Sequence, residues 1–86
     1  MLTIEQLRKK IEYTDVCIIK KLAEREALTK QIGQLKIKEG TEIIDLSREK
    51  ELFELYGCWC KKYKLQQAFV KRLFKTIINH SRKVQE

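Results

Sequence analysis

With 86 residues, 43% of them hydrophobic and 36% charged, the chain suits one small folded domain and is too apolar for a disordered segment. Its formal net charge of +7 at pH 7 fits a nucleic acid, a membrane surface or a small anionic ligand as the partner. The sequence has no proline and only three glycines, which excludes a fold with many turns and predicts a few long helices.

The first predicted helix starts after Thr3, which can serve as its N-cap, and continues to about Lys38. About 35 residues form a rod of roughly 50 Å, whereas a compact chain of this size is only about 30 Å across. One chain cannot cover the apolar seam of such a rod, so the sequence predicts an intertwined homodimer. The seam advances in steps of three and four, as in a coiled coil: Ile4, Leu7, Ile11, Thr14 or Asp15, Ile18, Leu22, Arg25, Thr29, Ile32 and Lys36.

Two shorter helices are predicted to follow. The segment KEGTEII, residues 38–44, forms a loop with Gly40 just past the helical pattern. A second helix begins between Asp45 and Ser47, and a break near residues 64–66 separates it from a third. The apolar faces are Leu52, Phe53, Tyr56, Trp59, Cys60 and Tyr63 in the second helix, and Phe69, Val70, Leu73, Phe74, Ile77 and Ile78 in the third. Residues 1–86 are therefore expected to form a single all-α domain of three helices per chain.

Both apolar seams end in polar residues. In the first helix Arg25 and Lys36 fall within one narrow arc, so two cations share a stripe that faces other helices. The stripe of the third helix continues through Ser81 and Gln85. A charge on a helix usually lies on a solvated face, but an unpaired buried cation costs several kcal/mol. This placement therefore favours an anionic ligand at the point where the two polar ends meet.

The segment DLSRE, residues 45–49, has two interpretations. As a helix start, Asp45 or Ser47 caps the helix, Glu49 suits its positive end and Arg48 pairs with Asp45. Helix N-termini also offer free N–H groups to oxygen-rich ligands. Capping is the more common situation, but it gives no special reason for Arg48.

Arg8 lies beside the seam of the first helix, 17 residues and about 25 Å before Arg25. The two arginines of one chain therefore cannot bind the same small ligand. In an antiparallel dimer, the partner's Arg8 could reach the Arg25 end. Taken alone, Arg8 is interpreted as a surface residue.

The other chemically reactive residues indicate no independent site. Cys58 and Cys60 would point about 200° apart on a helix, so together with Cys17 we expect three reduced thiols and no metal site or structural disulfide. Trp59 is expected in the core and His80 at the surface. With no signal peptide and no run of ~20 apolar residues, a soluble cytoplasmic protein is expected.

Five segments are informative together: LRKKIEYTD (7–15), LAERE (22–26), IGQLK (32–36), DLSRE (45–49) and RLFKTIINHSRKVQ (72–85). They are weak singly but specific in this order and spacing. In combination they closely resemble the all-helical chorismate mutases, small three-helix enzymes of phenylalanine and tyrosine synthesis, and the resemblance covers essentially the whole chain. It implies an intertwined homodimer that converts chorismate to prephenate by a Claisen rearrangement, with no cofactor, metal, nucleic acid or membrane.

The resemblance also implies a role for eight residues. The catalytic residues would be Lys36 and Gln85, which reach the ether oxygen of the breaking bond, while Glu49 holds the ring hydroxyl. Gln85 lies in the final turn, where fraying would weaken its contribution. The other substrate-binding residues would be Arg8 of the partner chain and Arg25 on the two carboxylates, with Asp45, Arg48 and Ser81 lining or ordering the pocket.

Two other functions stay open from the sequence. Isochorismate pyruvate-lyase uses the same bundle and similar cations, although Glu49 favours the mutase because it suits the hydroxyl of chorismate. A basic helical dimer that binds nucleic acid or a partner helix explains the charge but not the stripe of Ser81 and Gln85. The initial Met and the short length favour a complete enzyme over one module of a fused protein.

Overall fold

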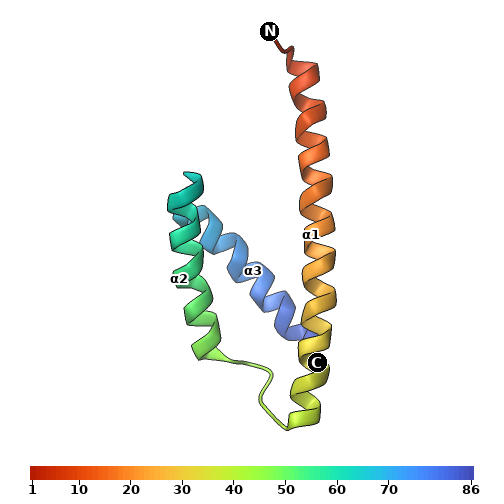
Figure 1. Cartoon of the computed structure of the whole chain (residues 1–86), viewed down its shortest axis with the longest axis vertical. Coiled ribbons are helices and arrows are strands. Elements are labelled where there is room, and N and C mark those ends of the chain that lie inside the picture. The colour runs from red at the N-terminus through yellow and green to blue at the C-terminus, as the bar shows by residue number, and fades with distance from the viewer.

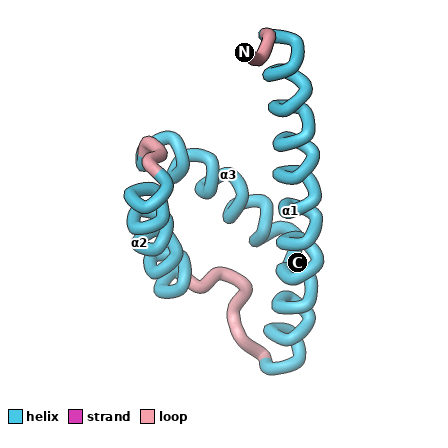
Figure 2. The backbone as a smooth tube through the Cα atoms, turned by 45° about the horizontal axis from the view of Figure 1, so that its top comes forward, coloured by secondary structure: helices cyan, strands magenta, loops and turns pink.

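The computed structural model describes all 86 residues as three helices joined by two short connections, with no strand (Figure 1 and Figure 2). Helix α1 spans Ile4–Glu39, α2 spans Leu46–Tyr63 and α3 spans Gln67–Gln85. The predicted all-α class, the overlong first helix and both connections are confirmed. None of the three helices combines the length and the hydropathy that a membrane span requires.

Local signals in the sequence determine where the helices begin and end. At the start of α1, the Thr3 hydroxyl accepts from the Gln6 N–H at 3.2 Å and the Gln6 side chain accepts from the Thr3 N–H at 2.9 Å, which forms a capping box. Gly40 ends α1 in the left-handed region, with φ 71°, where glycine has no steric cost. The Asp45 carboxylate caps α2 by accepting from the Arg48 backbone N–H at 3.0 Å.

Helix α3 joins the other two, because it packs against both α1 and α2 while these do not contact each other. Figure 1 shows α3 running obliquely from the end of α2 to the C-terminal part of α1, while the N-terminal half of α1 projects alone. The chain measures 57 × 24 × 16 Å, and its radius of gyration is 16.3 Å against about 12 Å for a compact chain of this length. A wedge between α1 and α2 is therefore left open by the backbone.

The core is small and aromatic. Only six residues are buried. Tyr56 of α2 stacks on Phe74 of α3 with ring centroids 4.1 Å apart, and Phe53 meets Tyr56 edge-on at 5.5 Å. The prediction that Trp59 belongs to the core is wrong for the single chain, since this side chain is 50% exposed at the rim of the wedge. The aromatic cluster therefore packs α2 against α3.

The apolar seam of α1 is uncovered in its N-terminal half. Ile4, Leu7, Ile11, Ile18 and Leu22 are each between 42% and 68% exposed. The accessible surface of the chain is 7561 Å², about 2,000 Å² more than a compact monomer of this mass exposes. Contiguous exposed apolar residues of this kind are typical of an interaction surface.

Candidate active site

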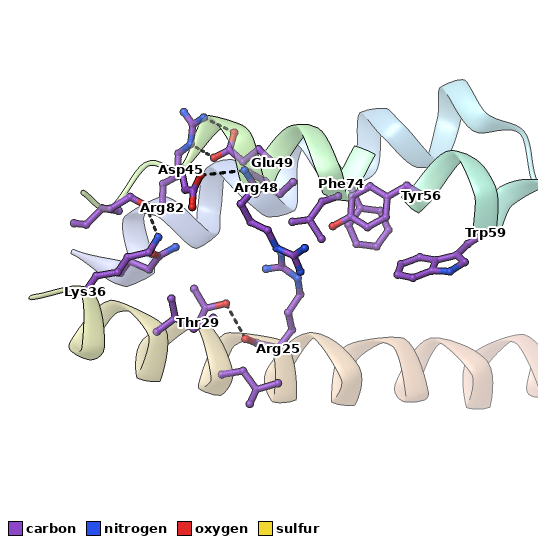
Figure 3. A pocket seen from close by; sticks show the side chains of 16 residues that line it. Arg25, Thr29, Lys36, Asp45, Arg48, Glu49, Tyr56, Trp59, Phe74 and Arg82 are labelled. Atoms are coloured by element: carbon purple, nitrogen blue, oxygen red, sulfur yellow. Dashed lines mark hydrogen bonds and ion pairs between the residues drawn. The ribbon is translucent and has the colours of Figure 1, made fainter. Parts of the chain in front are cut away.

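A cavity of about 580 Å³ occupies the wedge between the C-terminal half of α1, the start of α2 and the end of α3 (Figure 3). Half of the residues that line it are apolar and the others are polar. Such a mixture, apolar walls with a few convergent polar groups, is typical of small-molecule sites. The polar residues are Arg25, Thr29, Lys36, Asp45, Arg48, Glu49, Arg82 and Gln85.

Seven of the eight site residues predicted from the sequence lie together in this region. Ser81 is only 8% exposed and lies beside the cavity, where its hydroxyl accepts from the Arg25 guanidinium. Arg8 is exposed and lies outside the cavity, as its distance from Arg25 along α1 requires. The chemical roles of all eight stay predictions. The six that line the cavity are Arg25, Lys36, Asp45, Arg48, Glu49 and Gln85.

Arg25 is oriented by α3. The Ser81 hydroxyl that accepts from its guanidinium donates its own proton to the Ile77 carbonyl at 2.9 Å, so its lone pairs face the arginine. Thr29, one turn further along α1, is buried and donates to the Arg25 carbonyl at 2.9 Å. Arg25 takes part in none of the ion pairs of the chain. Its charge is therefore available to an anion in the cavity.

Arg48 extends into the cavity from the opposite side. Figure 3 shows its side chain and that of Arg25 pointing toward each other across the open space. The prediction that Arg48 pairs with Asp45 is wrong for the guanidinium, because only the Arg48 backbone N–H contacts that carboxylate. The nearest carboxylate partner is Glu51, at a long 3.9 Å. Two guanidinium groups that converge without a carboxylate between them favour a bound anion.

Lys36 and Gln85 form a pair of neighbouring donors at the end of the cavity. The Lys36 Nζ donates to the Gln85 Oε1 at 2.7 Å and to the Ile43 carbonyl at 2.6 Å. The Gln85 Nε2 donates to the Ser81 carbonyl at 3.3 Å. An ammonium has three N–H donors and an amide nitrogen has two, so each group keeps one donor for a ligand. This arrangement can stabilise negative charge on a single oxygen atom.

Gly33 permits the close crossing that brings Gln85 to Lys36. A Cβ on Gly33 would lie 2.8 Å from the Gln85 Cα and 2.9 Å from the Gln85 carbonyl oxygen. Any larger residue would therefore push the last turn of α3 away from α1. A glycine inside an otherwise strong helical pattern is the sequence signal for such a close approach, which the sequence analysis did not use.

Arg82 is the one charged residue of the cavity that was not predicted from the sequence. Its Nη2 and Nε donate to the two carboxylate oxygens of Glu49 at 2.6 and 2.9 Å. The side chains of Arg82 and Glu49 are 31% and 20% exposed, whereas the surface pair Lys21 and Glu24 is 77% and 62% exposed. The hydrogen bonds to Glu49 raise the pKa of the Arg82 guanidinium above its ordinary value.

A signal for Arg82 was present in the sequence. The apolar face of α3 continues from Phe74 to Ile78 in a step of four, and another step of four reaches Arg82. The prediction continued the stripe by threes and fours to Ser81 and Gln85 and passed over Arg82. The structure shows that Ser81 and Arg82 both lie at the site, because Ser81 contacts Arg25 on α1 and Arg82 contacts α2.

The comparisons with known proteins agree with one family. Residues 7–86 match the family described as chorismate mutase type II. The chain is 30% identical over 83 residues to the chorismate mutase of Methanocaldococcus jannaschii, covering 96% of this chain and 84% of that protein. It is 38% identical over 74 residues to the bifunctional chorismate mutase/prephenate dehydratase of Buchnera aphidicola subsp. Acyrthosiphon pisum, and 33% identical over 75 residues to that of Escherichia coli K12. It covers only 19% of the length of each bifunctional protein. The chain therefore belongs to the chorismate mutase type II family and is an isomerase.

Proposed function

We propose that two copies of this chain form an intertwined dimer with two active sites, each of which converts chorismate to prephenate. The observation that carries the proposal is the cavity itself, in which Arg25, Arg48 and Lys36 converge although no carboxylate neutralises them at short range. The only close ion pair in the cavity joins Glu49 to Arg82. A dicarboxylate substrate would supply the missing negative charge.

A second copy of the chain would supply what the single chain lacks. It would cover the exposed seam of α1, and the excess accessible surface matches the size of an obligate dimer interface. Antiparallel pairing of two α1 helices with the partner's Arg8 level with Arg25 puts the twofold axis near residues 16–17, midway between them. An apolar hollow of about 350 Å³ lies there, between α1 and α3, with Leu22 and Leu73 in its walls. The partner's side chains would fill it.

The rearrangement does not require the protein to form a covalent bond to the substrate. One C–O bond breaks while one C–C bond forms within the same molecule, so no nucleophile or proton transfer is needed. Catalysis then requires the compact reactive conformer to be held and the charge on the departing ether oxygen to be stabilised. The remaining donors of Lys36 and Gln85 would both serve that oxygen. An acceleration of about 10⁶ corresponds to roughly 8 kcal/mol of barrier lowering.

The remaining residues would bind and orient the substrate. Arg25 and the partner's Arg8 would hold the two carboxylates through charge-assisted hydrogen bonds. Glu49 would accept from the ring hydroxyl, because each carboxylate oxygen can accept a second hydrogen bond beside the one from Arg82. Ser81 would orient Arg25, Arg48 would add positive charge and Asp45 would hold the start of α2.

All three cysteines are free: Cys17 is half-buried, Cys58 is exposed and Cys60 is buried. Unpaired thiols are usual in reducing compartments, whereas structural disulfides belong to oxidising ones. The proposal therefore places the enzyme in the cytoplasm.

The first test is a direct assay with purified protein. Loss of chorismate absorbance is followed, and the product is identified by acid conversion of prephenate to phenylpyruvate. Saturable formation of prephenate is expected. A folded dimer that leaves chorismate unchanged would contradict the proposal. Turnover of isochorismate, or strongly salt-dependent binding of DNA, would then identify which of the two other functions applies.

A second test asks whether each site is shared between chains. Arg8→Ala and Arg25→Ala chains are each expected to be nearly inactive. When they are mixed and refolded together, half of the dimers are hybrids in which one of the two sites has both arginines, so roughly a quarter of wild-type activity is expected to return. If mixing restores nothing although hybrid dimers form, Arg8 does not act across the interface.

A further inference from the structure

Arg82, which forms an ion pair with Glu49, is the one charged residue of the cavity to which the family resemblance assigns no role. Glu49 lies in the first turn of α2 and Arg82 in the last turns of α3. The guanidinium uses two parallel N–H bonds, at 2.6 and 2.9 Å, so it fixes the carboxylate plane as well as its position. Figure 3 shows this pair bridging the two helices at the edge of the cavity, opposite Lys36 and Arg25.

Glu49 presents an electrostatic problem to a dicarboxylate ligand. Its carboxylate would repel the two negative charges of the substrate in a partly desolvated site. Arg82 is the only cation within ion-pair distance of that carboxylate. The other charged groups that line the cavity are Arg25 and Lys36 from α1, and Asp45 and Arg48 from the start of α2. Without Arg82, Glu49 would face the ligand and the Asp45 carboxylate with its charge uncompensated.

We propose that Arg82 is a positioning residue, which holds Glu49 as a correctly oriented acceptor for the substrate hydroxyl and offsets the repulsion between Glu49 and the substrate carboxylates. This inference rests on the proposed function, because it needs Glu49 to accept from a hydroxyl on a dianionic substrate. Arg82 acts through Glu49 and does not touch the substrate. Its contribution therefore depends on the charge of Glu49, and this dependence distinguishes it from a structural contact.

The test uses the intact chain with chorismate as the probe, and kcat and KM are measured separately. Arg82→Met keeps the length of the side chain and removes its charge. It is expected to lower kcat/KM at least about tenfold, chiefly through KM, because the Glu49 carboxylate is then left without a counter-charge beside the substrate. Arg82→Lys keeps the charge and is expected to stay within about threefold of the wild type.

A double-mutant cycle separates action through Glu49 from direct contact. In a Glu49→Gln background, the further change Arg82→Met is expected to alter kcat/KM by less than about twofold, because no carboxylate is left to hold. Lys83→Met, an exposed neighbour on α3, is the matched control for loss of one positive charge and is expected to leave kcat/KM unchanged.

Three results would overturn the inference. An equal loss in both backgrounds would mean that Arg82 contacts the substrate itself. A loss that falls chiefly on kcat and comes with a lower Tm would mean that Arg82 only fastens α3 to α2, and no loss would mean that it has no role. If Arg82→Met does not fold, Arg82→Lys and the double variant still decide between these results. A wild-type protein that does not convert chorismate would instead reject the proposed function.

Discussion

One continuous seam runs along α1, but its side chains are apolar in the N-terminal half and include two cations in the C-terminal half. In the N-terminal half the seam carries Leu7, Ile11 and Ile18, which are exposed. In the C-terminal half it carries Arg25 and Lys36, which are half-buried beside α3. The periodicity is the same in both halves, so the difference lies in the side chains and in what each half meets.

The proposed function gives the two halves different tasks. The N-terminal half would pack against a second copy, and apolar contact is non-directional, so many side chains of similar size would serve. The C-terminal half would bind an anion, and its hydrogen bonds depend on individual atoms such as the Lys36 Nζ and the Gln85 Oε1. We therefore expect damage to the first half to abolish the assembly, and damage to the second half to abolish the chemistry while the fold persists.

The largest effect is expected from a charge placed on the apolar half. Ile11 is 58% exposed in the single chain, so a stable monomer would tolerate Ile11→Glu within about 0.5 kcal/mol. In the proposed dimer this change places a carboxylate in an apolar interface. We expect the dimer to be lost, with at least about a thousandfold loss of turnover because an obligate dimer has no stable folded monomer. Sedimentation measures the loss of the dimer, circular dichroism measures helical content, and steady-state kinetics with chorismate measure the loss of turnover.

Lys9→Gln is the matched control for that experiment. Lys9 lies two residues before Ile11, on the opposite side of the helix, and it is exposed. The control makes the same change of one negative unit in net charge and is expected to leave dimerisation and activity intact. A folded, active Ile11→Glu protein would show that the exposed seam needs no partner.

The next largest effect is expected from a substitution in the polar, C-terminal half of α1. Lys36→Ala is expected to lower kcat about 10²–10³-fold, as for the loss of one donor to a developing oxyanion. The dimer and the helical content are expected to persist, because Lys36 is only half-buried and lies outside the apolar N-terminal half of the seam. Steady-state kinetics with chorismate measure the loss, and Lys38→Ala, an exposed lysine half a turn away, is the control. A loss of kcat under about tenfold would remove Lys36 from the role assigned to it.

A smaller effect is expected from a substitution at Gly33, where α1 and α3 cross. Gly33→Ala places a Cβ 2.8 Å from the Gln85 Cα, so the last turn of α3 must move. A displacement near 1 Å is expected to lower kcat between about 10- and 100-fold without removing any group that touches the substrate. Kinetics at saturating chorismate measure this effect.

Gly57→Ala is the control for the backbone change at Gly33. The nearest atom to a Cβ at Gly57 is the Gln67 Oε1 at 3.4 Å, an ordinary contact with a flexible side chain. Alanine in a helix interior is favoured over glycine by about 0.5–1 kcal/mol, so Gly57→Ala is expected to keep full activity and gain stability. Equal activity of the two variants would mean that Gln85 tolerates displacement.

The helices could be predicted from the sequence because their signals are local. The spacing of apolar residues gave the length of α1, and Thr3 and Gly40 marked its ends within one residue. The polar ends of the seams indicated the region of the site. Each of these inferences needs only helix geometry and the chemistry of residues within one segment.

The contacts that define the site could not be predicted in the same way. Glu49 and Arg82 are 33 residues apart and meet only because α2 and α3 cross at a particular place. The contact between Gly33 and Gln85 likewise depends on how closely α1 and α3 approach. The proposed role of Arg8 depends on a second chain, which no pattern within one chain can position. Packing between segments decides all three.

The smallest effect is expected at the junction of the two halves of α1, where Glu26 contacts His80 of α3 at 2.7 Å. The hydrogen bond from His80 holds the pKa of Glu26 below its ordinary value of 4.5, with a smaller contribution from Lys30. A carboxylate with a lowered pKa stabilises the folded state above pH 4.5, and this contribution is lost as the pH falls below that value.

Glu26→Gln is therefore expected to lower Tm by no more than roughly 4 °C at neutral pH, because the pair is exposed, and to have no effect in strong acid. Thermal unfolding of both proteins across this pH range measures the difference. Glu24→Gln, which removes a neighbouring carboxylate from an exposed pair with Lys21, is the control. A Tm difference that is the same at every pH would show that Glu26→Gln removes a contact whose strength does not depend on the charge of Glu26. A difference confined to pH values above the ordinary glutamate pKa would show that the ionised carboxylate of Glu26 stabilises the packing of α3 on α1.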